Sequence, residues 1–374
     1  MYSARESLFH PIFEYSHLRH RNTHRMAKKE QLVTGVDIGS SAVKVCKLQK
    51  TGKGYIIVAV GSAALPPGSV EDGVLQEPEE VGRIVAGLFK NLKIKSHSKV
   101  GISISGYSVI VKKVNLEIMN EEELAEYIHS EAEQYIPFDI DEVYLDFQDL
   151  KTGGPDADRT DVMLVAAKKE VIDDYLEMLQ EQKLKPVLVD VDGFALENIW
   201  ETTGHADENV ALVDIGASKM NINIISGGAS VLARDVVVGS EQLTEQIATT
   251  LDIDYEEAEK IKLGLVSLQE HQQEVENIFN QTCTQWVLEM KKAIDLYMAN
   301  NPDTPLNRLV LSGGGSKVKG LISFIERETG LEVISFNPFV HMSFNKKKID
   351  PDYIDAIAPE MAIAAGLAIR PADF

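Results

Sequence analysis

One short motif occurs twice in this sequence and constrains the fold more than any other feature. Val33–Leu48 reads VTGVDIGSSAVKVCKL, and Ala211–Ile225 reads ALVDIGASKMNINII. In both copies an apolar run ends at an aspartate, the chain turns on a glycine, and a second apolar run follows. The two aspartates, Asp37 and Asp214, stand almost half the chain apart. We therefore expect two similar halves that present the same hairpin to each other.

The bulk composition indicates a globular protein with more than one domain. The chain has 374 residues, of which 44% are hydrophobic and 25% are charged. Its formal net charge of −21 argues against broad nucleic-acid binding and against an electrostatic membrane patch, although it leaves room for a local basic face. No apolar run has transmembrane length. Cys46 and Cys283 lack metal-site spacing, so we expect a reducing compartment and no disulfide.

Residues 1–30 differ in character from the rest of the chain. They are rich in arginine, lysine and histidine, and they lack the continuous apolar stretch of a signal peptide. We interpret them as a disordered tail, or as the product of a misassigned start codon with Met26 as the true initiator. A metal-binding or membrane-touching arm is the alternative.

The order of strand-like and helix-like patterns divides the remaining chain into several units. The β-rich runs after Gln31 predict an antiparallel meander. Residues 107–186 read strand-helix-strand-strand-helix, and the first of these helices starts at a capping box, Asn120 with Glu123, and runs to Ile136. Apolar spacing predicts further helices at 78–92, at 170–182, along the stretch 240–300 and from about Pro359.

These patterns give a domain assignment. We assign 31–106 to a first lobe, to which 187–208 and 352–374 return, 107–186 to an inserted module, 209–245 and 301–351 to a second lobe, and 246–300 to a helical subdomain of that lobe.

Each Asp-Ile-Gly hairpin has the chemistry of a phosphate site. Glycine lets the backbone approach a ligand that a Cβ atom would block, and successive amides in such a turn can point at one anion. An aspartate repels phosphate but suits the orientation of water around Mg²⁺, so Asp37 and Asp214 are candidate metal residues acting through water. A glycine turn with a solvated aspartate is the plain alternative for a single copy, and the repetition disfavours it.

A third motif, Leu311–Leu321 with the sequence LSGGGSKVKGL, predicts a strand that runs through glycines into a helix. Glycines at a helix N-terminus form an anion or nucleotide cradle. The motif is neither a Walker A loop nor the GxGxxG fingerprint. A flexible strand-to-helix turn is the alternative for this motif alone.

Taken together, the three motifs resemble the actin-like ATPase superfamily over about Gln31–Arg370. Within it the sequence is most similar to the PilM family, the FtsA-like cytoplasmic proteins of type IV pilus assembly. VTGVDIGSSAVKV, EAEQYIPFDIDEVYLDFQ, ALVDIGASKMNINII and LVLSGGGSKVKGL carry the resemblance. It implies an α/β actin-like ATPase fold of two lobes, each with a ribonuclease-H-like core, plus an FtsA-type inserted subdomain.

The resemblance also implies ATP and Mg²⁺ as cofactors and assigns residues to them. One phosphate hairpin would use Asp37, Gly39, Ser40, Ser41 and Lys44; the other would use Asp214, Gly216, Ala217 and Ser218; the adenosine pocket would use Gly313, Gly314 and Gly315. In the family a Glu/Lys pair on a helix reaches the ribose and base, and Glu259 and Lys262 match it. A solvated i,i+3 salt bridge is the alternative for that pair.

The implied partner is PilN, an inner-membrane pilus protein whose N-terminal tail binds a groove beside the inserted module. Ile136, Pro137, Phe138, Tyr144 and Phe147 are candidate groove residues, although for half of them a core position is the better interpretation. The protein would then be a cytoplasmic scaffold of pilus biogenesis and twitching motility. It would be peripheral at the inner membrane through its partners and in contact with other platform proteins, and the resemblance leaves open a homo-oligomer.

Two other functions compete with the scaffold. A small-molecule kinase of the same superfamily needs a general base beside the γ-phosphate, and no known kinase motif supplies one here, so catalytic residues stay unassigned and at most slow ATP hydrolysis is expected. An FtsA-like division filament would end in an amphipathic helix, whereas this sequence ends in AGLAIRPADF. Both points favour the scaffold.

Overall fold

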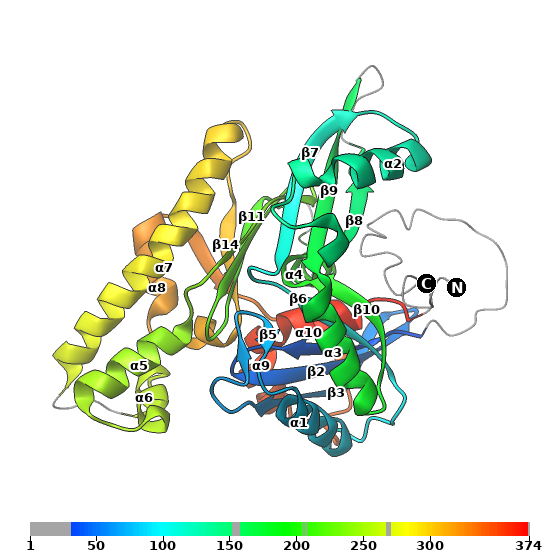
Figure 1. The fold of residues 1–374 in the computed structure, drawn as a ribbon. Coiled ribbons are helices and arrows are strands. Elements are labelled where there is room, and N and C mark those ends of the chain that lie inside the picture. The colour runs from blue at the N-terminus through cyan, green and yellow to red at the C-terminus, as the bar shows by residue number, and fades with distance from the viewer. Residues whose placement is uncertain (1–30, 152–157, 204, 206–207, 267–270, 373–374) are drawn as a thin grey trace.

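The computed structural model describes residues 31–151, 158–203, 205, 208–266 and 271–372. These residues form two large mixed sheets, helices between and outside them, and a smaller third sheet (Figure 1). The expectations for residues 1–30 fall outside the described part. Within that part, no helix is long and apolar enough to cross a membrane.

The first large sheet contains the predicted meander. Its strands lie in the order β10 (Lys185–Val191), β6 (Lys99–Ile104), β1 (Thr34–Ile38), β2 (Ala42–Thr51), β3 (Gly54–Ala64) and β16 (Ser343–Phe344). The strands β1, β2 and β3 pair antiparallel, as predicted, while β6 and β10 continue the sheet in parallel with β1. The strand β16 comes from the range 301–351, yet it pairs in parallel with β3 of the first sheet.

The second large sheet repeats this plan. Its order is β13 (Ala229–Val236), β12 (Met220–Ser226), β11 (Val210–Ile215), β14 (Arg308–Ser312) and β15 (Glu332–Ser335). The strands β11, β12 and β13 form an antiparallel meander, and β14 and β15 extend it in parallel with β11. The two halves are therefore built alike around β1–β2 and β11–β12.

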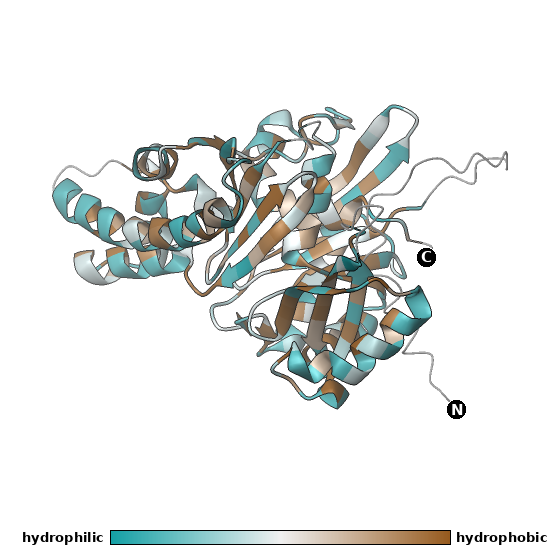
Figure 2. Cartoon of the chain, turned by 90° about the horizontal axis from the view of Figure 1, so that it is seen from above, coloured by the Kyte–Doolittle hydropathy of each residue, from teal (hydrophilic) through white to brown (hydrophobic). Residues whose placement is uncertain are grey.

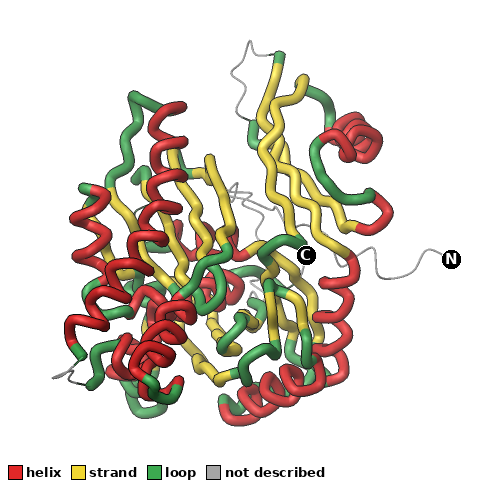
Figure 3. The backbone as a smooth tube through the Cα atoms, turned by 60° about the vertical axis from the view of Figure 1, so that its left-hand side comes forward, coloured by secondary structure: helices red, strands yellow, loops and turns green. Residues whose placement is uncertain are grey.

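Helices form layers between and outside the two sheets (Figure 3). The inner layer is α4 (Asp192–Glu201), α9 (Pro351–Ile357) and α10 (Ala362–Ala368), whose apolar side chains share one core with both sheets. On the outer faces lie α1 (Pro78–Asn91) and α3 (Lys169–Glu181) for the first sheet, and α5 (Ser240–Leu251), α6 (Tyr255–Lys262), α7 (Gln272–Asn300) and α8 (Leu321–Thr329) for the second. Hydrophobic residues accordingly follow the strands that helices cover (Figure 2).

The inserted segment has a small core of its own. Its sheet has the order β7 (Val109–Glu117), β9 (Arg159–Lys168) and β8 (Val143–Asp149), and α2 (Glu121–Glu131) packs on it. The last helix of the segment, α3, contributes its apolar face to the core of the first large sheet instead. Beside that core lies a two-stranded hairpin of β4 (Val70–Glu71) and β5 (Val74–Leu75).

Several helix limits differ from the predictions. The capping box at Asn120 and Glu123 is present, but α2 ends at Glu131 and gives way to a 3₁₀ turn, so the helix predicted to Ile136 was too long. In the described part of the stretch 240–300 the chain forms α5, α6 and α7; α5 and α6 are separate helices because Asp252 adopts a left-handed conformation after α5 and the side chain of Asp254 caps α6. The helix expected near Pro359 starts as a 3₁₀ turn, Ala358–Met361, before α10.

The small residues of α10 allow an unusually close contact with its neighbours. A Cβ atom on Gly366 would lie 1.8 Å from the carbonyl oxygen of Ala195 in α4, and one on Gly35 of β1 would lie 2.1 Å from the carbonyl oxygen of Ala364. Both partners are backbone atoms, which cannot turn away as a flexible side chain does. The helix α10 is thus packed backbone to backbone against both α4 and β1.

We expect Gly366→Ala to destabilise the protein by several kcal/mol, because α4 and α10 must separate to admit a methyl group. The matched control is Gly87→Ala on α1, where a Cβ atom meets nothing within 4 Å. That change should stabilise by roughly 0.5–1 kcal/mol through helix propensity. Urea unfolding of both variants checks the prediction, and equal stability for the two would contradict it.

Candidate functional site between the two lobes

The two repeated hairpins have the same turn geometry. In the first, the amide of Gly39 donates to the carbonyl of Ala42 at 3.0 Å, and in the second the amide of Gly216 donates to the carbonyl of Lys219 at 2.9 Å. The predicted residues Ser40 and Ser41 lie inside the first turn, and Ala217 and Ser218 lie inside the second. The amides of both turns are thereby held in the compact loops that the sequence motif predicted.

The sheet topology explains why other polar side chains gather at these hairpins. The strands β1, β6 and β10 are parallel, so their carboxyl ends meet at one edge of the first sheet. Ser105 follows β6 and Asp192 follows β10 at that edge. Ligand sites of open α/β sheets lie outside the carboxyl ends of parallel strands.

Asp37 and Lys44 form a buried pair beside the first turn. Lys44 Nζ lies 3.0 Å from Asp37 Oδ2, and the two residues are register partners on β1 and β2. Burial raises the pKa of Asp37, and the nearby Asp192 raises it further, against the lowering effect of Lys44. Burial would lower the pKa of Lys44, but Asp37 and Asp214 raise it, so the ammonium stays charged.

Asp192 is a third carboxylate of the site, and the sequence analysis did not single it out. Its Oδ2 lies 3.1 Å from Lys219 Nζ of the second hairpin, and Ser105 donates to the same oxygen. Lys219 also donates to the Ser105 hydroxyl. Although burial acts to raise the pKa of Asp192, the field of Lys219 and the serine hydrogen bonds lower it. An acidic residue directly after a buried strand, in VDVDGF, was the signal available in the sequence.

Asp214 completes the acidic group from the second lobe. Its Oδ2 accepts a 2.7 Å hydrogen bond from the Ser312 hydroxyl at the end of β14. Burial raises the pKa of Asp214 to about 6, and its carboxylate also feels the charges of Lys44, Asp37 and Asp192. The predicted residues Asp37, Lys44 and Asp214 are therefore brought together, with Asp192 and Lys219 among them.

The three glycines after β14 have different surroundings. A Cβ atom on Gly313 would lie 2.3 Å from the Ile215 carbonyl oxygen, and Gly313 has a φ of 81°. A Cβ atom on Gly315 would lie 2.4 Å from Ile215 Cγ2, whereas one on Gly314 would meet nothing within 4 Å. Gly313 and Gly315 thus pack the turn against the end of β11. Only Gly314, of the three, leaves open space beside its backbone.

Glu259 and Lys262 form an i,i+3 ion pair at 2.7 Å, as in the alternative interpretation. The lysine, however, is not on a solvated helix face. The Lys262 side chain is 4% exposed, and burial lowers its pKa. Lys262 Nζ lies 3.3 Å from the carbonyl oxygen of Ser240, whose own amide bonds to Gly216 of the second hairpin. Through Ser240, the pair is therefore connected to the hairpin turn of the second lobe at Gly216.

The charges at the centre of the site suit a hydrated divalent cation with an anion. Three carboxylates (Asp37, Asp192 and Asp214) face two lysines (Lys44 and Lys219), which leaves an excess negative charge for Mg²⁺ to neutralise. Among the described residues, no group of three His, Cys, Asp or Glu side chains could hold a metal alone. Water and ligand oxygens would have to supply the remaining coordination.

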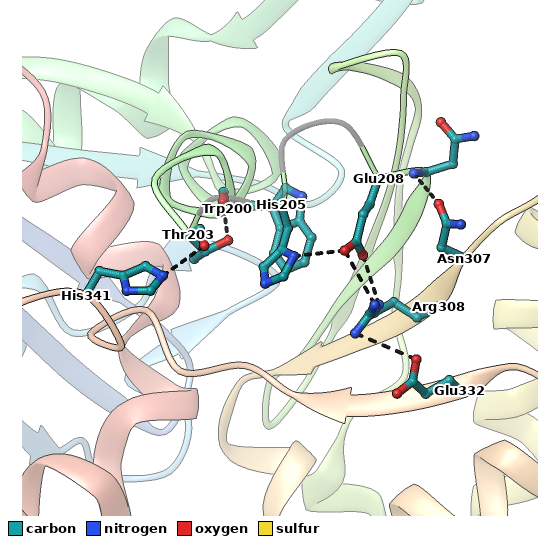
Figure 4. A network of polar contacts seen from close by, with 9 residues as sticks. Trp200, Thr203, His205, Glu208, Asn307, Arg308, Glu332 and His341 are labelled. Carbon is teal, nitrogen blue, oxygen red and sulfur yellow. Dashed lines mark hydrogen bonds and ion pairs between the residues drawn. The ribbon is translucent and has the colours of Figure 1, made fainter.

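A second polar network lies where the chain passes from α4 into β11 (Figure 4). The His205 ring stacks on Trp200, with ring centroids 5.7 Å apart, and its Nδ1 lies 2.8 Å from Glu208 Oε1. Arg308 of β14 bridges Glu208 at 2.9 Å and Glu332 at 3.7 Å. This network fixes the connection between the lobes on the side of the sheets where β11 and β14 begin, away from the hairpins.

A protein-family model described as type IV pilus assembly protein PilM matches residues 35–372. The chain belongs to the PilM family. A solved PilM–PilN type IV pilus biogenesis complex contains a chain that is 26% identical, with a TM-score of 0.80, over 91% of this chain and 98% of that one.

More distant solved structures share the fold. The ethanolamine utilization protein EutJ of Carboxydothermus hydrogenoformans is 16% identical with a TM-score of 0.53, over 90% of this chain and 89% of that one. MreB5 of Spiroplasma citri, bound to ADP, is 11% identical with a TM-score of 0.53, over 91% and 95%. These likenesses confirm the predicted actin-like ATPase fold with two lobes.

Asp214→Asn should separate stability from ligand binding. An aspartate whose pKa is raised to about 6 in the folded protein, from an ordinary value near 4, destabilises the fold at neutral pH by on the order of 2 kcal/mol. This cost grows as the pH rises from 4 to 6 and stays constant above. The variant should therefore be more stable than the parent at pH 7.5 and equal to it at pH 4, by urea unfolding.

The same variant should bind Mg·ATP at least tenfold more weakly, because a neutral amide orients cation-bound water poorly. In the parent protein, Mg·ATP affinity should fall as the pH drops through 6. Unchanged affinity in the variant would remove Asp214 from the site, whatever its effect on stability.

Gly314→Val tests the third motif. Because its Cβ direction is open, we expect folding to be retained and Mg·ATP binding to weaken by tenfold or more through steric exclusion. Gly315→Val is the matched control that should lose the fold itself, since its Cβ collides with Ile215. Thermal melts and nucleotide titration distinguish the two effects. A Gly314→Val protein with full affinity would show that the ligand does not approach this backbone.

Proposed function

We propose that this protein is a nucleotide-gated scaffold of the type IV pilus machinery. It binds Mg·ATP between its lobes and the N-terminal tail of PilN at the inserted subdomain, on the cytoplasmic side of the inner membrane. Membership of the PilM family supports a role in type IV pilus assembly, and the likeness to a chain of the PilM–PilN complex supports PilN as the partner. The single observation that carries the nucleotide role is the pair of identical hairpins with Asp37 and Asp214 in one charged cluster.

In this proposal each predicted residue has a defined task. The amides and hydroxyls of the two turns bind the phosphates, Lys44 and Lys219 balance their charge, and Asp37 and Asp214 orient the water shell of Mg²⁺. Glu259 and Lys262 reach the ribose and base, and the backbone at Gly314 lies against the adenosine. Relatives of the same fold support this assignment, since MreB5 of Spiroplasma citri was solved with ADP.

The inserted sheet offers an edge for an extended peptide. Its order, β7-β9-β8, leaves β8 as an edge strand, and an edge strand can pair with an added chain. Of the five candidate groove residues, Ile136 is buried in the core, Pro137 is exposed, and Phe138, Tyr144 and Phe147 are half-buried. Lys168 and Lys169 lie over the rings of Phe138 and Tyr144. Phe138 and Phe147 pack on the inserted module's own core, whereas Tyr144 packs on the core of the first large sheet, so we assign the PilN tail to the edge of β8 that lies between these two faces.

Contacts between the lobes support coupling of the two sites. The amide of Gly106 donates to Asp235 Oδ2 of β13 at 2.7 Å, and Asn221 of β12 donates to the other oxygen at 2.7 Å. The neighbouring residue, Ser105, contacts Asp192 and Lys219, and β7 of the inserted sheet begins at Val109. A phosphate that draws Lys219 away from Asp192 would alter the segment from which the inserted sheet starts. Nucleotide and peptide would then be thermodynamically linked.

Calorimetric titration of a PilN N-terminal peptide, with and without Mg·ATP, tests the proposal. We expect peptide affinity to change at least fivefold with nucleotide. An affinity indifferent to nucleotide would reduce ATP to a structural ligand. No binding in either state would overturn the scaffold function.

Asp235→Ala is the variant that tests the route of coupling. It removes the contact to Gly106 without touching the inserted sheet, so peptide affinity in the absence of nucleotide should stay unchanged. The ratio of the peptide affinities measured with and without Mg·ATP should approach one. A full nucleotide effect in this variant would show that coupling takes another path.

A further inference from the structure

Lysines gather at one end of the first sheet, although the chain as a whole is strongly acidic. Three segments meet there: the end of α1 with the start of β6, the end of α3 with the start of β10, and the end of β2. Their lysines are Lys90, Lys93, Lys95, Lys99, Lys183, Lys185, Lys47 and Lys50. No aspartate or glutamate occurs in residues 44–56, 89–102 or 182–189. The acidic residue nearest in sequence to any of these lysines is Glu181, two residues before Lys183. We call these eight side chains the lysine face.

The strand register brings the three segments together. Lys185 of β10 pairs with Lys99 of β6, and Thr34 of β1 pairs with both Val100 of β6 and Lys47 of β2. The loops are joined as well, since the amide of His97 donates to Lys183 O at 2.7 Å and the amide of Lys185 donates to Ser98 O at 3.0 Å. The face is therefore one contiguous surface and not a set of scattered charges.

Like charges on this face are crowded. Burial lowers the pKa of Lys47, and the charge of Lys95 lowers it further. Lys47, Ser98 and Lys99 line a hollow of about 370 Å³, whose rim includes the side chain of Val58, 48% exposed. Within the described part of the chain, Lys90, Lys95 and Lys185 are exposed and make no ion pair. An anionic surface would relieve this crowding.

We propose that the lysine face contacts the anionic headgroups of a membrane directly. The net charge of −21 argues against a membrane patch for the chain as a whole but has little effect on a local basic face, because the Debye length at physiological salt is about 8 Å and charges farther from the surface are screened. Lysine has a flexible stem and a compact charge, which suits a diffuse layer of headgroups better than a defined carboxylate partner. Each exposed lysine near such a surface adds a small increment, so several together give a contact that salt can reverse, whereas Lys99 Nζ already donates to the carbonyl oxygen of Ala372.

The inference goes beyond the proposed scaffold and does not depend on its nucleotide. It adds a second, weak contact to the attachment through PilN, and it sets which end of the first lobe points at the bilayer. A tether that already holds the protein near the surface makes a weak contact effective.

Co-sedimentation of the full chain with vesicles tests the contact. One set contains equal parts of phosphatidylglycerol and phosphatidylcholine, and the other contains phosphatidylcholine alone. The test variant is Lys90→Glu/Lys95→Glu/Lys185→Glu. The matched control is Lys346→Glu/Lys347→Glu/Lys348→Glu, which follows β16 at the opposite edge of the sheet from β10 and makes the same change in net charge. All proteins retain residues 1–30, so that differences report on the face.

We expect the parent and the control to bind the anionic vesicles at low salt. Their affinity should fall steeply between about 50 and about 200 mM salt, because salt in this range screens the charges at the surface. The test variant should bind at least tenfold more weakly. Equal loss in both variants would assign the effect to net charge, and equal retention in both would exclude the face; either overturns the proposal. Self-association of the parent that the test variant lacks, seen by sedimentation velocity without lipid, would make the face a contact between copies instead.

Discussion

The inner helical layer is the constraint on which the rest of this structure depends. The helix α4 packs on the first sheet and on the second sheet, and α10 packs on α4 and on the first sheet, so the apolar side chains of both lobes share one core. At Gly366 and Gly35 the packing is backbone against backbone, with no side chain to adjust. Because Gly35 lies on β1, the same contact positions Asp37 two residues later. Stability of the fold and placement of the first Asp-Ile-Gly hairpin therefore depend on the same interaction.

The electrostatics of the site favour the proposed binding of a metal together with the nucleotide. Lys44 and Lys219 are engaged with Asp37 and Asp192, and a phosphate can attract them only by competing with carboxylates. An anion added alone would join three acidic groups and raise their pKa further. A divalent cation added with it supplies the missing positive charge and lets the lysines turn to the phosphates. Burial is the main cause of the raised pKa of Asp214, and the neighbouring carboxylates of Asp37 and Asp192 raise it further.

The sequence predicted those parts of the site that lie close together in the chain. The hairpins at Asp37 and Asp214 and the glycine turn after β14 are local motifs, so their geometry could be anticipated before any fold was known. Asp192, Ser105 and Asp235 could not be found in this way, because sheet order alone brings them to the hairpins. The helix predicted to Ile136 was too long for a related reason: apolar spacing continued, while a 3₁₀ turn after Glu131 ended the helix. Assignment of α3 to the inserted module likewise followed chain order, whereas its apolar face packs on the first sheet.

The segment from Ser103 to Ser108 connects the inserted subdomain to the charged cluster at the two hairpins. Ser105 touches both members of the Lys219–Asp192 pair, Gly106 is held by Asp235, and the carbonyl of Ser108 accepts the amide of Lys168 at the end of β9. Six residues thus join the charged cluster at the hairpins to two strands of the inserted sheet. A Cβ atom on Gly106 would lie 2.9 Å from the carbonyl oxygen of Asp72, so the segment is also packed against the β4–β5 hairpin and cannot move independently of it. A tightly packed segment of this kind transmits a displacement by shifting between discrete positions, which is how a small change at a phosphate could become a change in a groove.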